Sequence, residues 1–418
     1  MRLTIATAGS RGDAQPYVAL ALGLAAAGHE VKIAGDPEFE GLVTQRGLEF
    51  AALPLNGRNA FTKCPEHLQN PASMLRWIKA NYSPDRAYFE SMLAALRGSD
   101  AALVASLAFP AVHVAEALDI PWIGAFLQPW TPSRAFSWVL PADLPRWIPD
   151  PIKGEINWWS SRSASLLTLR ALRDAIDDGR RDVLGLPPVS FDEYTAFGSA
   201  DTPAIYGYSP LLVPDQPVWT TKQRVTGFWF LDGNSWRPPE RLARFLAEGE
   251  PPVVVGFGSM GDCGANETSA LVIEALGQVR RRGILLGGWA GLGKAEDLPK
   301  TILRLDEAPH DWLLPHAAAI MHHGGAGTTA AALRAGIPSI IAPFFGDQPF
   351  WGQRIHALGV GPAPIKRKHL TVTRVASALE DALSPETVAC AASLGERVRA
   401  EEGIGAAVRE VEDLLERP

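Results

Sequence analysis

Short apolar runs alternate with helical stretches along the first half of the chain. Residues 2–9 (RLTIATAG) have the pattern of a buried strand, and residues 17–27 form an apolar helical stretch that Gly28 ends. Residues 30–35 (EVKIAG) then predict a second strand. Further strand-like runs follow at 101–106 (AALVAS) and 121–126 (PWIGAF). This alternation predicts a mainly parallel, doubly wound α/β sheet.

The second half repeats the pattern after a change in composition. Residues 208–252 are rich in Pro and Trp, which indicates a linker region between two domains. New apolar runs then recur as PVVVGFGS, RGILLGGW, TILRLDEA, AAAIMHHGG and SIIAPFF. We therefore expect two similar α/β domains, residues 1–215 and 225–394, that face each other. The amphipathic segment at about 395–418 is expected to be a helix that packs back on the first domain.

Charge and composition narrow the classes of function. The 418 residues carry a net charge of −7, which argues against nucleic acid as a partner. The basic run Lys366–Lys368 is interpreted as a solvated loop. Three cysteines lie far apart, so neither a disulfide framework nor a zinc site is indicated. We see no basic leader and no apolar run near the ~20 residues of a membrane span, so we expect a cytoplasmic location.

The stretch from Ile320 to Gly352 carries the most specific chemistry. Apolar residues lead into the turn HHGGAGTT, and an Ala-rich helix and a second strand follow. Backbone N–H groups and the positive end of the helix dipole meet at such a turn, so a diphosphate suits it. His323 is expected to donate a ring N–H to a phosphate oxygen, while His322 is interpreted as structural. The other turn residues expected at the phosphates are Gly325, Gly327, Thr328 and Thr329.

Two polar residues follow the second strand of this stretch. Asp347 and Gln348 are expected at the same edge of the sheet, where ligands of open α/β sheets bind. A carboxylate accepts hydrogen bonds and an amide both donates and accepts them, so the pair suits sugar hydroxyls. A simple turn after a strand is the alternative.

Residues 256–261 (GFGSMG) match the sequence pattern GxGxxG, which is found in dinucleotide-binding sites. The next strand ends LLGGWAG and lacks the acidic residue that holds a ribose, which disfavours a nicotinamide or flavin site. Ser259 in this run either donates its hydroxyl to a phosphate or makes a local loop hydrogen bond.

Asp13 lies in the run GSRGDAQP at the start of the first helix. It is either the N-cap of that helix or a general base that takes a proton from an acceptor hydroxyl. An aspartate with an ordinary pKa near ~3.9 is a weak base, so proton transfer would accompany bond formation. The sequence identifies no partner that orients this carboxylate.

Tryptophan is frequent between residues 122 and 159. The interspersed Phe and Pro residues predict irregular apolar walls for a flat hydrophobic acceptor, with core packing or a membrane-surface patch as alternatives. The residues expected to line this acceptor pocket are Trp122, Phe126, Trp130, Phe136 and Trp138. The chain has no DxD motif of the kind that clamps a metal on a sugar nucleotide, so we expect no metal site.

Five segments together resemble family 1 inverting glycosyltransferases of the GT-B fold. They are GSRGDAQPYVALALGLAAAGHEV, QPWTPSRAF, GFGSM, APHDWLLPHAAAIMHHGGAGTTAAALRAGIPS and APFFGDQPFWGQRIHALGVGPAPI. Within that family the likeness is to the sterol 3-β-glucosyltransferases and to bacterial enzymes that glycosylate natural products. It implies two facing Rossmann-like domains with a deep interdomain cleft, the acceptor bound by the first domain and the nucleotide sugar by the second.

The resemblance also implies residue roles. It makes Asp13 the general base. It assigns the diphosphate to Ser259, His323, Gly327, Thr328 and Thr329, the sugar to Asp347 and Gln348, and the nucleobase to Trp289 and the backbone near Ala308. Plant small-molecule members carry a His where Asp13 stands, a Glu for the ribose where Ala331 stands and a Trp near Glu307. The choice between UDP and dTDP therefore stays open.

We expect a metal-independent inverting glycosyltransferase that moves a hexose from a UDP-sugar, with UDP-glucose as the expected donor, to a hydroxyl of an apolar acceptor. Sterols, triterpenoids and other natural-product aglycones are the expected acceptors, and peripheral membrane contact is a further expectation. No cofactor is expected beyond the nucleotide-sugar co-substrate. A sugar-nucleotide 2-epimerase of the same fold and a catalytically silent homologue that activates a partner are the alternatives. The regiochemistry and the oligomeric state stay open.

Overall fold

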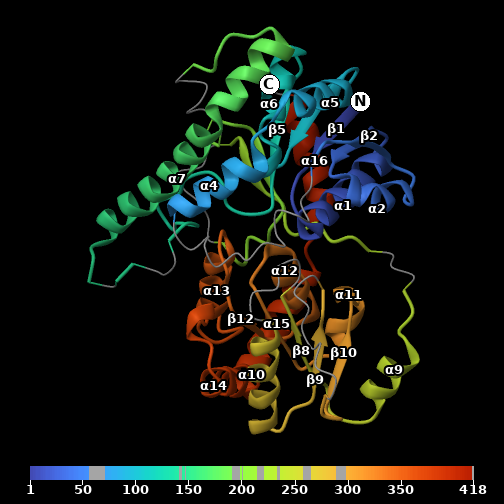
Figure 1. Cartoon of the computed structure of the whole chain (residues 1–418), viewed down its shortest axis with the longest axis vertical. Coiled ribbons are helices and arrows are strands. Elements are labelled where there is room, and N and C mark those ends of the chain that lie inside the picture. The colour runs from blue at the N-terminus through green and yellow to red at the C-terminus, as the bar shows by residue number, and fades with distance from the viewer. Residues whose placement is uncertain are drawn as a thin grey trace. The chain divides into compact units, whose positions relative to one another are not determined.

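The computed structural model describes residues 1–55, 71–140, 144–145, 147–190, 198–199, 201–213, 221–232, 236–257, 265–288 and 298–416. These residues form two compact units (Figure 1). The first unit takes the described residues up to Leu231 together with those from Glu402 onward. The second takes the described residues from Asp232 to Glu401.

The first unit is built on a parallel sheet of seven described strands in the order β3-β2-β1-β4-β5-β6-β7. Its strands are β1 (Arg2–Ala6), β2 (Glu30–Gly35), β3 (Glu49–Ala52), β4 (Ala101–Val104), β5 (Trp122–Phe126), β6 (Ala204–Tyr206) and β7 (Gln223–Val225). In the register, Ile5 of β1 lies opposite Ile33 of β2 and Leu103 of β4. β4 is buried along its whole length, as expected of a parallel strand covered on both faces. The apolar runs of the first half therefore form the core of this unit.

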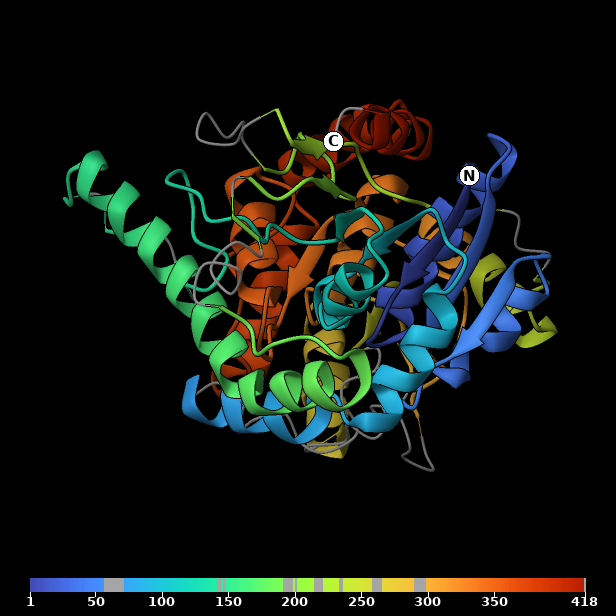
Figure 2. The same ribbon diagram turned by 90° about the horizontal axis from the view of Figure 1, so that it is seen from above.

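Helices surround this sheet. They are α1 (Arg11–Ala26), α2 (Glu40–Thr44), α4 (Pro71–Tyr82), α5 (Arg86–Leu96), α6 (Ala111–Ala117), α7 (Asp150–Gly179) and α16 (Gly403–Glu416). Figure 2 shows α4 and α7 running side by side along one side of the unit. The last helix, α16, packs on α1, where Gly23 lies against Ile404 and Val408.

The second unit has a parallel sheet of five described strands in the order β10-β9-β8-β11-β12. Its strands are β8 (Val253–Gly256), β9 (Gly283–Leu286), β10 (Ile302–Leu305), β11 (Ala319–His322) and β12 (Ser339–Ile341). Its helices are α9 (Glu240–Ala247), α10 (Ala265–Gln278), α11 (His310–Leu313), α12 (Ala326–Ala335), α13 (Gln348–Ala357), α14 (Val372–Ala382) and α15 (Pro385–Arg399). β8 and β11 are buried throughout and form the centre of this sheet.

Two bounds differ from those that the sequence predicts, and one helix is longer than its apolar stretch. The first unit extends to Leu231 instead of residue 215, because β7 pairs with β6 of the same sheet. The apolar stretch of residues 17–27 is the later part of a helix that begins at Arg11, and Pro16 is accommodated within this helix. The C-terminal segment is two helices, since α15 belongs to the second unit and α16 begins only at Gly403. Any side chain at Gly403 would overlap the backbone of Phe228, so this close approach requires glycine.

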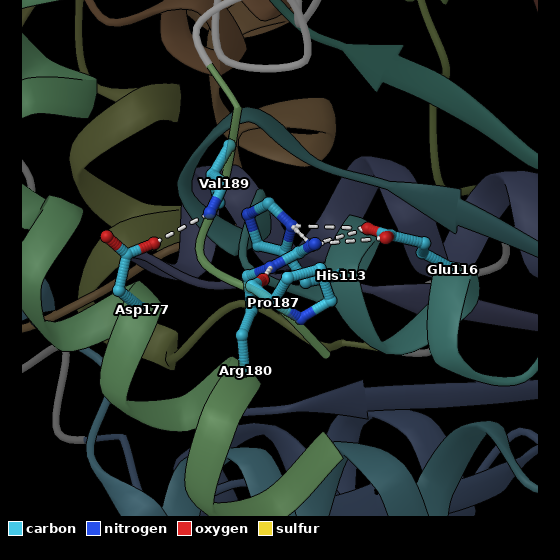
Figure 3. Close-up of polar contacts among 6 residues, drawn as sticks. All are labelled: His113, Glu116, Asp177, Arg180, Pro187 and Val189. Carbon is cyan, nitrogen blue, oxygen red and sulfur yellow. Dashed lines mark hydrogen bonds and ion pairs between the residues drawn. The ribbon is translucent and has the colours of Figure 1, made fainter. Parts of the chain in front are cut away.

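A buried arginine ties α6 to the end of α7 in the first unit. Figure 3 shows Arg180, which follows α7, pointing toward Glu116 and His113 of α6. Its guanidinium donates to both carboxylate oxygens of Glu116, one at 3.0 Å, and to the carbonyl of Pro187 at 2.7 Å, while Nη1 lies 3.0 Å from Nδ1 of His113. Interactions with His113 and then with Arg180 lower the pKa of Glu116 to about 2. This cluster therefore stabilises the fold in its ionised form.

Glu116→Gln is expected to lower the free energy of unfolding of the first unit at pH 7 by about 1–3 kcal/mol. The loss is smaller than the ~3–5 kcal/mol of a fully buried pair, because solvent screens the partly exposed carboxylate. A lowered pKa stabilises the folded state above the ordinary pKa of 4.5, and this contribution is lost as the pH falls from about 4.5 to about 2. Urea unfolding followed by fluorescence at pH 7 and at pH 4 measures both effects.

Asp178→Asn is the matched control for this prediction. Asp178 forms an ion pair with Arg181, three residues further along the chain, at 2.7 Å, and both side chains are exposed. Loss of this pair should leave the free energy of unfolding close to that of the wild type. If Glu116→Gln destabilised the protein no more than Asp178→Asn, the stabilising role of the buried cluster would be wrong.

Candidate active site

The loop after β1 holds Asp13 at the carboxyl edge of the first sheet. Asp13 lies in the first turn of α1, and its Oδ2 accepts hydrogen bonds from the backbone N–H of Ser10 at 2.7 Å and from Ser10 Oγ at 2.9 Å. Gly9 has a φ of +129°, and a Cβ there would overlap the Asp13 carboxylate. Ser10 and Gly9 thus fix one oxygen of the carboxylate. None of the described residues hydrogen-bonds Oδ1.

The surroundings of Asp13 make it a stronger base than an exposed aspartate. Burial raises the pKa of Asp13 above its ordinary value of 3.8, and the two hydrogen bonds from Ser10 offset only part of this effect. Its negative charge in turn raises the pKa of Tyr17 and of Tyr82, in each case after the larger effect of burial. Asp13 is therefore suited to accept a proton from a bound hydroxyl.

Sequence reasoning missed two neighbours of Asp13. Asp36 follows β2, the next strand of the sheet, is buried, and accepts a hydrogen bond from Glu38 N–H at 3.0 Å. Its place directly after a predicted strand was a signal that could have found it. Tyr82 ends α4, and its hydroxyl is buried with no hydrogen-bond partner among the described residues. No sequence pattern connects Tyr82 with Asp13, since only the tertiary fold brings α4 to this edge.

The turn between β11 and α12 forms the second part of the candidate site. His322 ends β11, is fully buried, and accepts a hydrogen bond from Gly324 N–H through Nδ1 at 3.1 Å. Burial, followed by the nearby His323 and His310, lowers the pKa of His322 well below its ordinary value. Gly324 has a φ of +89°, and a Cβ there would overlap Ile341. His322 thus has a structural role, holding the turn in this conformation.

His323 lies over the start of α12. Its Nε2 occupies the place that a Cβ at Gly325 would take, so only glycine leaves room for the ring. Burial and then the charge of His310 lower the pKa of His323 to about 4, so the ring is neutral at physiological pH. Gly325 is the N-cap of α12, and no side chain caps the helix there. A neutral donor and an uncapped helix N-terminus together suit an anion.

The two threonines of this turn differ. Thr328 is half-buried in the first turn of α12, whereas Thr329 is almost completely buried. The hydroxyl of Thr329 has no hydrogen-bond partner among the described residues. Gly327, half-buried, separates these threonines from Gly325.

Asp347 and Gln348 organise the loop after β12. Gln348 is buried, and its Oε1 accepts hydrogen bonds from the backbone N–H groups of Phe344 at 2.8 Å and Phe345 at 3.3 Å. Asp347 is the N-cap of α13 and accepts a hydrogen bond from Trp351 Nε1 at 2.6 Å. Both side chains therefore stabilise the turn after β12, as the alternative interpretation of this pair expects. The half-buried Asp347 carboxylate is the more accessible of the two.

Three residues predicted at the nucleotide lie outside the turn between β11 and α12. Ser259 and Trp289 lie outside the described residues. Ala308 is half-buried between β10 and α11, two residues before His310. His310 was missed by sequence reasoning, although its charge lowers the pKa of both His322 and His323. Across the described ranges, no three His, Cys, Asp or Glu side chains gather as metal ligands would.

Part of the predicted acceptor pocket forms one aromatic stack. The rings of Phe126 and Trp130 are stacked with centroids 6.0 Å apart, and those of Trp130 and Trp138 with centroids 5.6 Å apart. The ring of Tyr206 in β6 is tilted against that of Phe126, with centroids 5.6 Å apart. The Tyr206 hydroxyl donates a hydrogen bond to Thr131 Oγ1 at 2.6 Å. This aromatic stack begins at the carboxyl end of β5.

The other two predicted pocket residues lie at the start of β5 and in the loop that follows this strand. Trp122 begins β5, about 13 Å along the strand from Phe126 at ~3.3 Å per residue, and packs against the core of the first unit. Phe136 is half-buried in the loop that follows. Core packing, one of the alternatives, thus describes Trp122.

Two family models match this chain. Residues 3–137 match the glycosyltransferase family 28 N-terminal domain, and residues 272–414 match the erythromycin biosynthesis protein CIII-like C-terminal domain. The first match contains Asp13, and the second contains His323, Asp347 and Gln348.

Curated relatives match along almost the whole chain. Two sterol 3-beta-glucosyltransferases of Arabidopsis thaliana are 35% and 33% identical over 98% of this chain and 65% and 67% of their own length. A sterol 3-beta-glucosyltransferase of Aspergillus fumigatus is 36% identical over 98% of this chain and 30% of its own length. The chain thus spans about two thirds of the plant relatives and less than a third of the fungal one.

Solved structures match the fold. The kitacinnamycin glycosyltransferase has a TM-score of 0.73 at 20% identity over 99% of each chain, and the calicheamicin glycosyltransferase CalG4 has 0.72 at 18% identity over 100% of this chain and 98% of its own. The glycosyltransferase VinC in complex with dTDP has 0.68 at 20% identity over the whole of both chains. These likenesses confirm the predicted α/β fold class of GT-B glycosyltransferases.

Proposed function

Because the chain belongs to the family of glycosyltransferases that includes the sterol 3-beta-glucosyltransferases, we propose that it transfers a hexose from a nucleotide sugar to a hydroxyl of an apolar acceptor. The observation that carries this proposal is the uncapped N-terminus of α12 under a neutral His323 in the second unit. In the first unit, the buried Asp13 carboxylate has a raised pKa and supplies a general base for the acceptor hydroxyl.

The turn between β11 and α12 is the proposed site of the donor diphosphate. N–H groups of Gly327 and Thr328 and the ring of His323 donate to the phosphate oxygens, and the dipole of α12 stabilises their charge. Asp347 accepts hydrogen bonds from the sugar hydroxyls, while Gln348 holds the loop in place. UDP-glucose is the proposed donor. Two observations support a nucleoside diphosphate sugar. The plant relatives are named glucosyltransferases, and VinC was solved in complex with dTDP.

Asp13 is the proposed general base. It takes the proton from the acceptor hydroxyl as that oxygen forms a bond to the anomeric carbon, and the bond from this carbon to the diphosphate breaks. The nucleoside diphosphate leaves with the bonding electrons, and the configuration at the anomeric carbon is inverted. Donors fixed at the α12 turn stabilise the charge that develops on the leaving oxygen, so the reaction needs no metal.

A sterol-like molecule is the proposed acceptor. The printed names of the plant and fungal relatives support this class. The aromatic stack of Phe126, Trp130 and Trp138 supplies flat apolar surface in the first unit, which suits a fused-ring molecule.

Incubation of the chain with UDP-glucose and a panel of sterols, triterpenoids, macrolides and flavonoids in excess chelator is expected to give a hexosylated product by mass spectrometry. dTDP-glucose serves as the parallel donor. Complete dependence on added Mg²⁺ would contradict the metal-free mechanism. An epimerised UDP-sugar without acceptor would favour a 2-epimerase, and tight UDP binding with no product from any acceptor would favour a silent homologue.

A further inference from the structure

A group of exposed basic side chains lies at the carboxyl edge of the second sheet. The N–H of Ile365 donates to the carbonyl of Ile341, the last residue of β12, at 2.9 Å, so the residues after Ile365 lie just beyond the end of that strand. Lys366, Lys368, His369 and Arg374 are exposed there. We call these four residues the basic rim.

Stability of the fold does not explain the basic rim. None of Lys366, Lys368 and Arg374 forms an ion pair with any residue that the structure describes. Arg374 lies in the first turn of α14, where a cation is unfavourable because the helix dipole is positive at that end. Like charges that repel one another without carboxylate partners destabilise the folded state slightly. An external anionic partner would remove this cost.

The basic rim adjoins the loop that carries Asp347 and Gln348. The guanidinium of Arg367, within the same segment, lies 4.6 Å from the centroid of the Phe344 ring. The N–H of Phe344 in turn donates to Gln348 Oε1. The basic rim therefore lies at the margin of the proposed sugar site within one unit, and not on a remote face of the sheet.

We propose that the basic rim docks on an anionic lipid surface. Clustered Lys and Arg side chains are typical of binding to acidic headgroups, and the rim gathers Lys366, Lys368 and Arg374 within nine residues. The half-buried Leu370 and Val372 beside them supply apolar contact with the interface. The basic rim contrasts with the net charge of −7 of the whole chain, which disfavours the extended phosphate contacts that a nucleic acid needs. The lipid assignment rests on the proposed function, because an apolar acceptor resides in a bilayer. The basic run is thus a docking segment instead of a merely solvated loop.

Co-sedimentation of the full chain with lipid vesicles tests this proposal. The wild type is expected to bind phosphatidylcholine vesicles that contain about a third phosphatidylglycerol, to bind pure phosphatidylcholine weakly, and to dissociate as salt rises. The variant Lys366→Gln/Lys368→Gln/Arg374→Gln is expected to lose about 100-fold in partition coefficient, since each cation near such a surface is worth about fivefold.

The matched control removes the same charge elsewhere in the second unit. Arg241→Gln/Lys300→Gln/Arg397→Gln alters three other exposed cations and should keep binding within about twofold of the wild type, because these cations are not clustered. Circular dichroism and UDP titration verify that both variants are folded.

Three results would overturn the proposal: no binding of the wild type to anionic vesicles, equal losses in the two triple variants, or binding through the basic rim to RNA but not to vesicles. The vesicle assay needs no donor or acceptor. If the protein bound vesicles through the basic rim but showed no glycosyl transfer, the proposed function would be wrong and this inference would be supported.

Discussion

Asp13→Asn is expected to lower kcat by ~10²- to 10⁴-fold while the dissociation constant of UDP stays within about twofold of the wild type. The amide is isosteric with the carboxylate and can still accept the hydrogen bonds from Ser10, but it cannot take the proton of the acceptor hydroxyl. Steady-state kinetics and calorimetric titration with UDP separate the two effects.

Asp36→Asn is the matched control for this change. Asp36 lies at the same edge of the sheet, and Asn caps the short helical turn Pro37–Phe39 as well as Asp does, so kcat should fall less than tenfold. Near-normal turnover in Asp13→Asn, or an equal loss in both variants, would refute the role of Asp13 as base.

The buried position of Asp13 also predicts the acid limb of the pH–rate profile. Only the ionised carboxylate accepts a proton, so kcat/KM falls as the pH drops through the pKa of Asp13. Burial raises this pKa above 3.8, so the wild type should lose activity at a higher pH than an exposed aspartate would require.

His323→Ala is expected to lower kcat/KM by ~10²- to 10³-fold, the range for loss of one preorganised donor to a developing oxyanion. The pKa of His323 is about 4, so the neutral ring donates its hydrogen bond from an N–H group. The contact between this ring and the diphosphate therefore does not titrate between about pH 5 and pH 8. UDP titration across this pH range, together with kinetics of the variant, measures both properties.

His316→Ala provides the comparison for this change. His316 is exposed in the same unit, and its ring lies against Trp312, so its removal should leave kcat/KM close to that of the wild type. A step in UDP affinity near pH 6.5 that His323→Ala abolishes would show instead that the ring binds the diphosphate as a cation.

Hydrophobic patterning predicted most of the fold, because strands covered on both faces are continuous apolar runs. β4 and β8 are buried throughout and lie within such runs. The bounds of elements were predicted less well where tertiary contacts decide them. The break between α15 and α16 depends on the approach of Gly403 to Phe228, two segments far apart in the sequence.

The candidate site was predictable where one short segment carries it. The turn from His322 to Thr329 unites strand, glycines and helix N-terminus, so its geometry follows from local sequence. Tyr82 was not predictable, because its proximity to Asp13 arises only when α4 packs on the first unit. Trp122 illustrates the opposite case, since composition grouped it with Phe126 although the two residues lie at opposite ends of β5.

The proposed reaction is inverting hexosyl transfer from a nucleotide sugar to a hydroxyl of an apolar acceptor. The most direct test incubates the purified chain with UDP-glucose and a sterol in excess chelator and determines the anomeric configuration of the product by NMR. The proposed mechanism predicts a β-glucoside, inverted relative to the α-linked donor, whose initial rate of formation is at least ~10²-fold lower with Asp13→Asn than with the wild type. An α-glucoside, or an undiminished yield from Asp13→Asn, would contradict it.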